Sequence, residues 1–124
     1  MDFYKCQKCK NIITYLNKDK CDVMCCGLPM VKFEANTSDG AKEKHVPVVE
    51  VNGNTVKVTV GEVFHPMLDV HYIEWIMIET DHGRQRKMLK PGQEPVATFE
   101  LLEGEKVLAA YEYCNLHGLW KKEL

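Results

Sequence analysis

No part of the sequence approaches the roughly 20 consecutive apolar residues that a membrane-spanning helix requires, so we expect no membrane partner. It also contains no long amphipathic helical pattern, internal repeat or low-complexity tract. The formal net charge of −2 provides no general basic field, which argues against nucleic acid as a partner. The first residues, Met1 to Cys6, lack the apolar run of a signal peptide, so we expect a cytoplasmic protein whose thiols stay reduced.

The cysteines and histidines divide the chain into two regions. Five of the 6 cysteines fall within residues 1–26, whereas all 5 histidines come later. Residues 1–34 are too few to build a core of their own, because units below about 40 residues usually depend on a metal or on disulfides. Ala35 to Gly40 is small and polar, as in a linker or turn. We therefore predict a metal-bound domain at 1–34 and a second domain at 35–124.

The second domain is expected to consist of antiparallel strands. The runs 48–51 and 55–60 flank an Asn-Gly turn signal at Gly53, and the valines of the second run alternate with polar residues. Their spacing, with turn residues between them, predicts an antiparallel sandwich or barrel and a mainly β protein. Further short strands are predicted at 72–78, 84–89, 96–101 and 106–113.

The first region carries a four-thiolate pattern. Cys6 and Cys9 are separated by two residues, which lets both thiolates face one ion, and the adjacent pair Cys25 and Cys26 follows. Four thiolates satisfy a tetrahedral zinc or iron ion, and the spacing does not choose between the two metals. Adjacent cysteine side chains tend to diverge, so this pair should distort the tetrahedron. Cys21 is not needed, because two pairs already fill the site.

A second metal site is predicted from histidines and a single thiolate. Cys114 and His117 are three residues apart, and both can reach one ion from a single turn. Reduced cytoplasmic thiols favour metal binding, and a histidine-rich set with one thiolate is typical of a redox or Lewis-acid metal. Three further histidines lie in predicted loops or loop–strand junctions: His45, His65 and His71.

This second ligand set would leave a position open. Four imidazoles and one thiolate make five ligands, and an ion that prefers six then has one vacancy. Lys44, directly before His45, could attract a small anion to that position. His82 is not included, because it falls in an Asp-His-Gly turn that turn chemistry explains.

Together these residues resemble the desulfoferrodoxin family, the two-iron form of superoxide reductase. The resemblance extends over nearly the whole chain, and the motifs follow one another in the family's order. They are the Cys6/Cys9 and Cys25-Cys26 set, Glu43-Lys44-His45-Val46-Pro47, His65-Pro66-Met67, His71 with Ile73-Glu74-Trp75, Leu89-Lys90-Pro91-Gly92, and Tyr113-Cys114-Asn115-Leu116-His117-Gly118.

The resemblance implies a fold and two iron ions per chain. A desulforedoxin-like N-terminal domain would hold one iron by its four thiolates. An immunoglobulin-like antiparallel β-sandwich would hold a catalytic non-haem iron, with a sixth position that faces solvent. The ligands of this second iron would be His45, His65, His71 and His117 around the equator and Cys114 on the axis.

The reaction that the resemblance implies is the one-electron reduction of superoxide, with two protons, to hydrogen peroxide. Lys44 would draw in the anion and help position water for protonation, and Glu43 would occupy the sixth position in the resting oxidised state. A reduced carrier such as rubredoxin would return the iron to the ferrous form. We also expect a homodimer, and a role in electron transport and detoxification under oxidative stress.

Two residues depart from the family's pattern. Lys10 stands where relatives usually have Gly after the second cysteine, and Gly eases backbone N–H donation to sulfur. Tyr72 stands where relatives often have Trp.

Two other functions stay open at this point, a non-catalytic electron carrier and a zinc-stapled binding module. Glu43 and Lys44 favour the enzyme, because a carrier needs no open site beside a cation.

Overall fold

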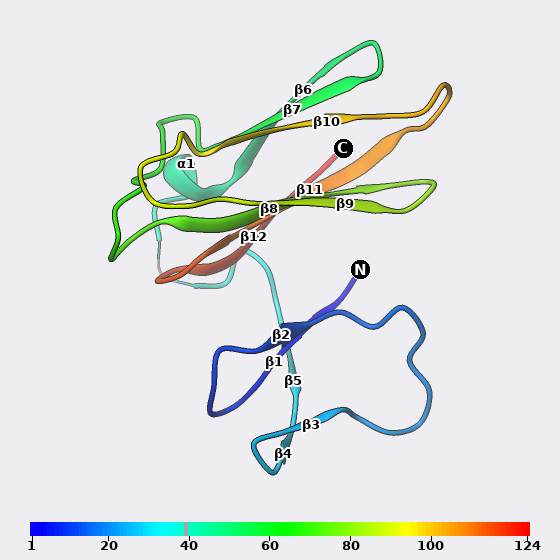
Figure 1. Ribbon diagram of the computed structural model, residues 1–124, viewed down its shortest axis with the longest axis vertical. Coiled ribbons are helices and arrows are strands. Elements are labelled where there is room, and N and C mark those ends of the chain that lie inside the picture. Colours follow the sequence, from blue (N-terminus) through cyan, green and yellow to red (C-terminus); the bar gives the residue numbers. More distant parts are fainter. Residues whose placement is uncertain (39) are drawn as a thin grey trace. The chain divides into compact units, whose positions relative to one another are not determined.

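The structure, a computed structural model, describes residues 1–38 and 40–124. Asp39, in the predicted linker, lies outside the described residues. The chain divides into two compact units, Met1–Glu34 and Ala35–Leu124 (Figure 1). Regular structure in the described residues is almost entirely β, so the predicted fold class is confirmed. Among these residues, no helix is long and apolar enough to cross a membrane.

The first unit consists of short strands joined by turns. β1 (Phe3–Lys5) is the middle strand of a three-stranded antiparallel sheet, between β2 (Ile12–Ile13) and β5 (Val31–Phe33). β3 (Met24–Cys25) and β4 (Leu28–Pro29) form a separate hairpin. The strands of this first unit are only two or three residues long, so backbone pairing and a small core give limited stability. A metal ion bound by its cysteines would increase that stability.

The second unit is a sandwich of two antiparallel sheets. One sheet has the strand order β10-β7-β6 and the other the order β12-β11-β8-β9. Seven strands in sheets of three and four form an immunoglobulin-like sandwich, as the sequence predicted. The strands are β6 (Pro47–Asn52), β7 (Thr55–Val60), β8 (Ile73–Thr80), β9 (Arg84–Met88), β10 (Val96–Glu100), β11 (Val107–Cys114) and β12 (Gly118–Glu123).

The core of the sandwich lies between these sheets and continues to the predicted metal ligands. The alternate valines of β7 are fully buried, so the predicted period-two pattern is confirmed. Cys114, at the end of β11, belongs to the same buried cluster and is completely enclosed. The cluster comprises Val56, Val58, Val60, Ile73, Ile76, Ile78, Ala97, Phe99, Leu101, Ala110 and Cys114.

Two elements beside the predicted site differ from the sequence prediction. His45 ends a short helix, α1 (Lys42–His45), because the Lys44 and Val46 N–H groups donate to the Ala41 and Lys42 carbonyls. The chain after His117 forms β12, which pairs with β11 along its whole length. Its strand pattern is weak in the sequence because only two adjacent residues of β12 are buried and apolar.

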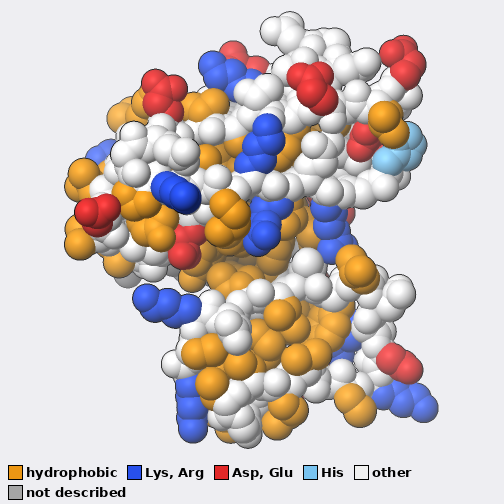
Figure 2. All heavy atoms as spheres, in the orientation of Figure 1, with side chains coloured by type: hydrophobic (Ala, Val, Ile, Leu, Met, Phe, Trp, Pro, Cys, Tyr) orange, Lys and Arg blue, Asp and Glu red, His pale blue; other side chains and the backbone are white. Residues whose placement is uncertain are grey.

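Charges of both signs are spread over the surface. On the face that Figure 2 shows, Lys and Arg side chains alternate with Asp and Glu over the larger unit, and no continuous basic area extends across that face. This distribution matches the net charge of −2 and the absence of a general basic field.

Candidate metal centres

The first candidate centre brings together the four predicted cysteines of the N-terminal unit. The sulfurs of Cys6, Cys9, Cys25 and Cys26 all lie within 4.8 Å of one another, and all four are free thiols. Cys9 Sγ lies 3.7 Å from Cys25 Sγ. A tetrahedral ion with metal–sulfur bonds of about 2.3 Å separates its sulfurs by about 3.8 Å. The donor set therefore fits a tetrahedral ion, and Cys21 is exposed outside it.

The adjacent cysteines converge because of the turn between β3 and β4. Cys26 and Gly27 both have positive φ, 52° and 77°, as in the type I′ turn that closes two-residue hairpins. A left-handed residue directs its side chain differently from an extended neighbour, so Cys25 and Cys26 can face one point. The divergence expected of adjacent cysteines is overcome in this way, at a cost of about 1–2 kcal/mol for a non-glycine residue.

Backbone N–H groups point at the sulfurs of this centre. Those of Cys9 and Lys8 each lie 3.3 Å from Cys6 Sγ and lower the pKa of Cys6 to about 6. The surrounding thiols raise the pKa of Cys26 to about 12. The four thiols therefore do not lose their protons equally easily. A bound cation would hold all four as thiolates. The Asn11 N–H still lies 3.5 Å from Cys9 Sγ, so Lys10 in place of Gly does not remove this contact.

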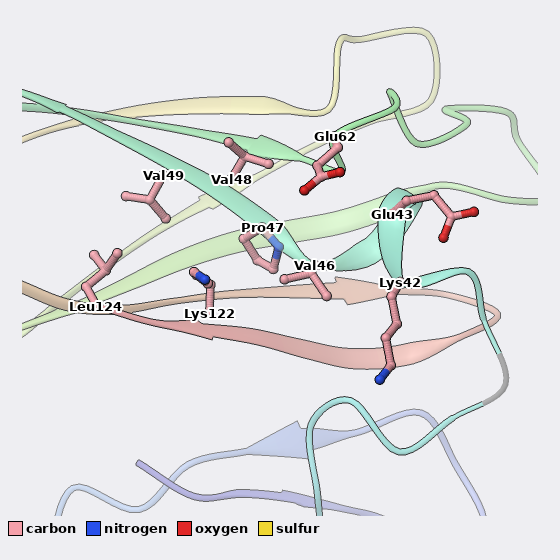
Figure 3. Close-up of a pocket in the computed structure, with 9 residues that line it drawn as sticks. All are labelled: Lys42, Glu43, Val46, Pro47, Val48, Val49, Glu62, Lys122 and Leu124. Carbon is pink, nitrogen blue, oxygen red and sulfur yellow. The ribbon is translucent and has the colours of Figure 1, made fainter.

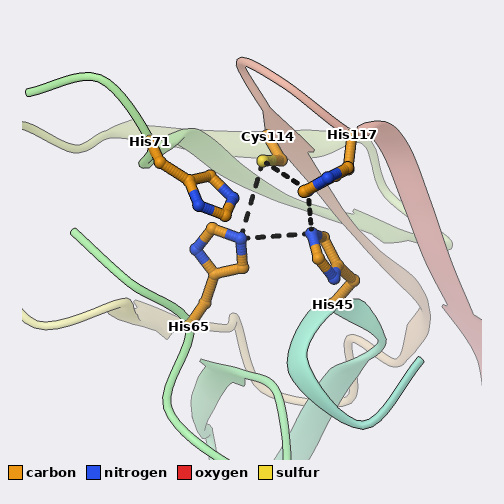
Figure 4. Close-up of side chains that lie close together, drawn as sticks. All are labelled: His45, His65, His71, Cys114 and His117. Carbon is orange, nitrogen blue, oxygen red and sulfur yellow. Dashed lines mark hydrogen bonds between the residues drawn. The ribbon is translucent and has the colours of Figure 1, made fainter. Parts of the chain in front are cut away.

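The second candidate centre is a square of four imidazole rings (Figure 4). Neighbouring ring centroids are 4.6 Å apart for His45 and His65, 4.6 Å for His65 and His71, 5.0 Å for His71 and His117, and 4.8 Å for His117 and His45. The diagonal from His45 to His71 is longer, at 6.4 Å. Neighbouring rings are close to perpendicular, which turns their nitrogens toward a common centre.

The nitrogen spacing in this square suits a metal ion. His45 Nε2 lies 3.1 Å from His65 Nε2 and 3.0 Å from His117 Nδ1. Four nitrogens in a square, each about 2.1 Å from an ion, would have neighbours about 3.0 Å apart. The arrangement therefore has the dimensions of a ligand set.

Cys114 lies on one side of the square. Its sulfur is 3.5 Å from His65 Nε2 and 3.8 Å from His117 Nδ1, which occupy opposite corners. The sulfur is thus almost equidistant from two opposite corners of the square. All five donor atoms are within 4.8 Å of one another, so the structure brings together the five residues that the sequence singled out.

Several separate elements supply these side chains. His45 comes from α1, and the end of β11 and the β11–β12 turn supply Cys114 and His117. His65 and His71 come from the segment between β7 and β8. The site thus lies where two ligand-bearing loops and a short helix meet one end of the sandwich, a common place for function on this type of scaffold.

Hydrogen bonds from the outer ring nitrogens fix two of the histidines. His45 Nδ1 lies 2.8 Å from the Ala41 carbonyl and His65 Nδ1 lies 2.7 Å from the Pro66 carbonyl. A carbonyl only accepts, so each Nδ1 carries the proton and each Nε2 presents a lone pair to the centre. His71 Nε2 is buried and has no hydrogen-bond partner among the described residues. A buried nitrogen without a partner is costly, and a metal ion would satisfy it.

The environment keeps three of these imidazoles neutral. Burial, with smaller contributions from nearby His45, His71 and His117, lowers the pKa of His65 to about 4. Burial also lowers the pKa of His45 and His71, and the neighbouring imidazoles and the Lys44 ammonium act in the same direction. Neutral imidazole is the form that binds metal, so these three histidines are already in the protonation state that an ion requires.

Asn115 ties the two ligand-bearing loops together. Its Oδ1 accepts from the Tyr72 N–H at 2.9 Å, and its Nδ2 donates to the Val70 carbonyl at 3.1 Å. The Asn115 N–H also donates to the Tyr72 carbonyl at 3.2 Å. The segment beside His71 is thereby fastened to the turn that carries Cys114. Sequence reasoning did not single out Asn115, and its position inside the Cys-x-x-His motif is the signal that could have found it.

A buried carboxyl group lies two residues before Cys114. Glu112 is fully buried, and neither of its oxygens has a hydrogen-bond partner among the described residues. Burial raises its pKa well above the usual range, so the neutral acid is favoured. Side chains alternate along a strand, so counting back by two from Cys114 along β11 would have placed Glu112 on the core face.

Glu43 and Lys44 are exposed in α1, directly before His45. Lys44 is among the charges that lower the pKa of His45 and His71, after burial and the nearby imidazoles, so its field reaches the site. Glu43 lines a separate cavity of about 550 Å³ with Lys42, Glu62 and residues of β6 and β12 (Figure 3). None of the five predicted ligands lines that cavity.

The fold and the two centres define a class of protein. It is a two-centre metalloprotein with a four-thiolate site able to bind iron, followed by an immunoglobulin-like sandwich whose four-imidazole, one-thiolate site is also able to bind iron. A family model described as desulfoferrodoxin matches residues 37–123. The chain belongs to the desulfoferrodoxin family.

Individual relatives cover between 77% and 99% of this chain. A desulfoferrodoxin from Nitratidesulfovibrio vulgaris is 52% identical over 98% of this chain and 95% of its own length. The crystal structure of the superoxide reductase from Treponema pallidum is 39% identical, with a TM-score of 0.83, over 99% of this chain and 100% of that chain. A superoxide reductase from Pyrococcus horikoshii is 37% identical over 77% of this chain and 97% of its own length.

Proposed function

We propose that this protein is a superoxide reductase, which combines superoxide with one electron and two protons to form hydrogen peroxide. The observation that carries the proposal is the square of four imidazoles with Cys114 on one side. Five donors would leave one position open on an ion that prefers six ligands. The similarity to the superoxide reductases of Treponema pallidum and Pyrococcus horikoshii supports the same activity.

We assign the ligands of the two iron ions from these groups of side chains. When bound, iron at the second centre supplies one-electron redox chemistry, and the Cys114 thiolate tunes it by donating electron density. The first centre would use Cys6, Cys9, Cys25 and Cys26, and the second would use His45, His65, His71, His117 and Cys114.

Lys44 and Glu43 are proposed to act on the substrate side of this centre. The Lys44 ammonium attracts the superoxide anion, because its field already reaches His45 and His71. It also orders water from which the product takes protons. When iron is bound, Glu43 would supply a carboxylate for it in the resting oxidised state. The neighbouring Lys44 ammonium would favour the superoxide anion over that carboxylate during the reaction.

The wider setting of the reaction is proposed from the family resemblance. A reduced carrier of the rubredoxin type would supply the electron, and the protein would act as a cytoplasmic homodimer in electron transport and detoxification under oxidative stress. The first centre is suited to one-electron transfer because backbone N–H groups donate to the sulfurs of Cys6 and Cys9, and such bonds tune the reduction potential of iron–thiolate centres. Its part in the reaction would be seen in a Cys9→Ser variant, whose second centre should still react with superoxide.

The activity is tested by mixing the reduced, iron-loaded protein with a pulse of superoxide. We expect oxidation of the second centre at a rate close to the diffusion limit, followed by release of peroxide. Zinc-loaded protein is the matched control, because zinc fills the same donors and has no redox chemistry. A slow reaction of an iron-replete sample, or an equal reaction of the zinc form, would contradict the proposal.

A further inference from the structure

Gly61 stands where the helix that carries Lys44 meets the loop that carries His65. It follows β7, is buried and has a φ of +81°. A Cβ atom added at this position would lie 2.7 Å from the Glu43 carbonyl oxygen, 2.7 Å from the Lys44 carbonyl carbon and 2.5 Å from the Val63 carbonyl oxygen. The backbone of α1 therefore rests directly on the Cα atom of Gly61.

The same turn is hydrogen-bonded to both sides of the site. The Val63 N–H donates to the Glu43 carbonyl at 3.1 Å, and the His65 N–H donates to the Val60 carbonyl at 3.1 Å. Residues 61–65 thus connect a predicted metal ligand to the backbone of the Glu43–Lys44 pair. A shift of the His65 loop would move the Glu43–Lys44 backbone, and the reverse also holds, because all the contacts between them are with backbone atoms.

We infer that Gly61 is a positioning residue, which sets the distance of the Glu43–Lys44 backbone from the His65 loop. The inference rests on the proposed function of Lys44 and adds the element that holds this lysine in place. Any side chain at position 61 would push α1 away from the loop. The displaced helix would carry Lys44 and His45 with it, so both anion attraction and metal binding would change.

Other glycines of the chain have a positive φ like that of Gly61 but lack its close contact, so they show which effect belongs to the contact alone. Gly53, Gly92 and Gly104 also have positive φ, but an added Cβ at each would have no atom within 4 Å. Gly104 is the closest match, since its φ of +79° is almost that of Gly61. Alanine at either position meets the same backbone strain, and only alanine at position 61 meets α1.

The test compares Gly61→Ala with Gly104→Ala in the full chain. We expect G61A to lower the rate with superoxide at low ionic strength by about tenfold or more, to weaken the salt dependence of that rate and to shift the part of the visible sulfur-to-iron absorption that comes from the second centre. In the zinc-loaded protein, which needs no activity, hydrogen exchange of the Val63 amide should accelerate. G104A should keep wild-type values for all four measurements.

Each result either supports or overturns the positioning role of Gly61. Wild-type salt dependence, visible band and Val63 exchange in G61A would overturn the inference. If G61A does not load metal, Val63→Pro decides instead, because it removes the N–H that donates to Glu43 and adds no Cβ at position 61. Weakened salt dependence supports the inference, and unchanged salt dependence overturns it. If wild-type protein does not react with superoxide, the proposed function is wrong, and the exchange measurement still tests the contact.

Discussion

Replacing Asn115 with alanine should loosen the second metal centre without touching a ligand. The Asn115 side chain accepts from the Tyr72 N–H at 2.9 Å and donates to the Val70 carbonyl at 3.1 Å. Its neighbour Cys114 and the nearby His71 belong to the five-donor group. The substitution removes both side-chain hydrogen bonds and leaves the backbone contact with the Tyr72 carbonyl in place.

The expected loss in the free energy of unfolding follows from the two side-chain hydrogen bonds of Asn115. The Tyr72 N–H is partly buried, and leaving it unpaired costs about 1–2 kcal/mol. The bond to Val70 is exposed and contributes about 0.5–1 kcal/mol. We therefore expect a loss of about 2 kcal/mol in the free energy of unfolding. Residues that orient metal ligands typically change metal affinity by about 10–100-fold, and we expect a loss in that range.

The assay measures iron affinity by chelator competition and stability by urea unfolding. Asn36→Gly is the matched control, because Asn36 makes two bonds of the same kind with the Lys121 backbone and its φ of +62° suits glycine. N36G should lose less stability, because both of its side-chain bonds are exposed, and it should keep its iron affinity. Asn115→Asp keeps the acceptor for Tyr72 and should fall between wild type and N115A. Wild-type iron affinity in a destabilised N115A would refute the reasoning.

Three further results are expected. Lys44→Ala should slow the superoxide reaction and flatten its dependence on ionic strength, whereas Lys57→Ala, at an exposed site on β7, should change neither. Cys114→Ser should remove the second centre's contribution to the visible sulfur-to-iron absorption and preserve the β circular dichroism, and an unchanged contribution from that centre would show that another sulfur binds. Metal-free protein should lose stability as pH falls from 6.5 towards about 4, since the pKa of His65 is about 4 when folded and 6.5 when unfolded. In that window the unfolded chain binds more protons, and a flat profile of urea midpoint against pH would contradict this.

Much of the fold could be predicted because its signals are local. The alternating valines of β7 and the turn at Gly53 lie within one hairpin, and both appear in the structure. The helix α1 could not be predicted, since four residues carry no helical period. β12 was also missed, because its burial depends on pairing with β11 and not on its own alternation.

The candidate sites also combine residues that the sequence reveals with residues whose role only the structure shows. Ligand residue types are few and chemically distinctive, so cysteines and histidines could be selected before their contacts were known. Their supports are common residues whose role exists only in three dimensions. Asn115 acts through residues 70–72, and Gly61 acts through the backbone of α1, about 17 residues earlier in the chain. The left-handed turn at Cys26 likewise depends on pairing between β3 and β4.

The central claim, reduction of superoxide at the five-donor centre, is tested most directly by product stoichiometry. Reduced, iron-loaded protein is given a known amount of superoxide under anaerobic conditions, and hydrogen peroxide and dioxygen are both measured. We predict one peroxide for each superoxide consumed and no dioxygen, because the electron comes from the protein. One peroxide for every two superoxides, with dioxygen released, would show dismutation and contradict the account.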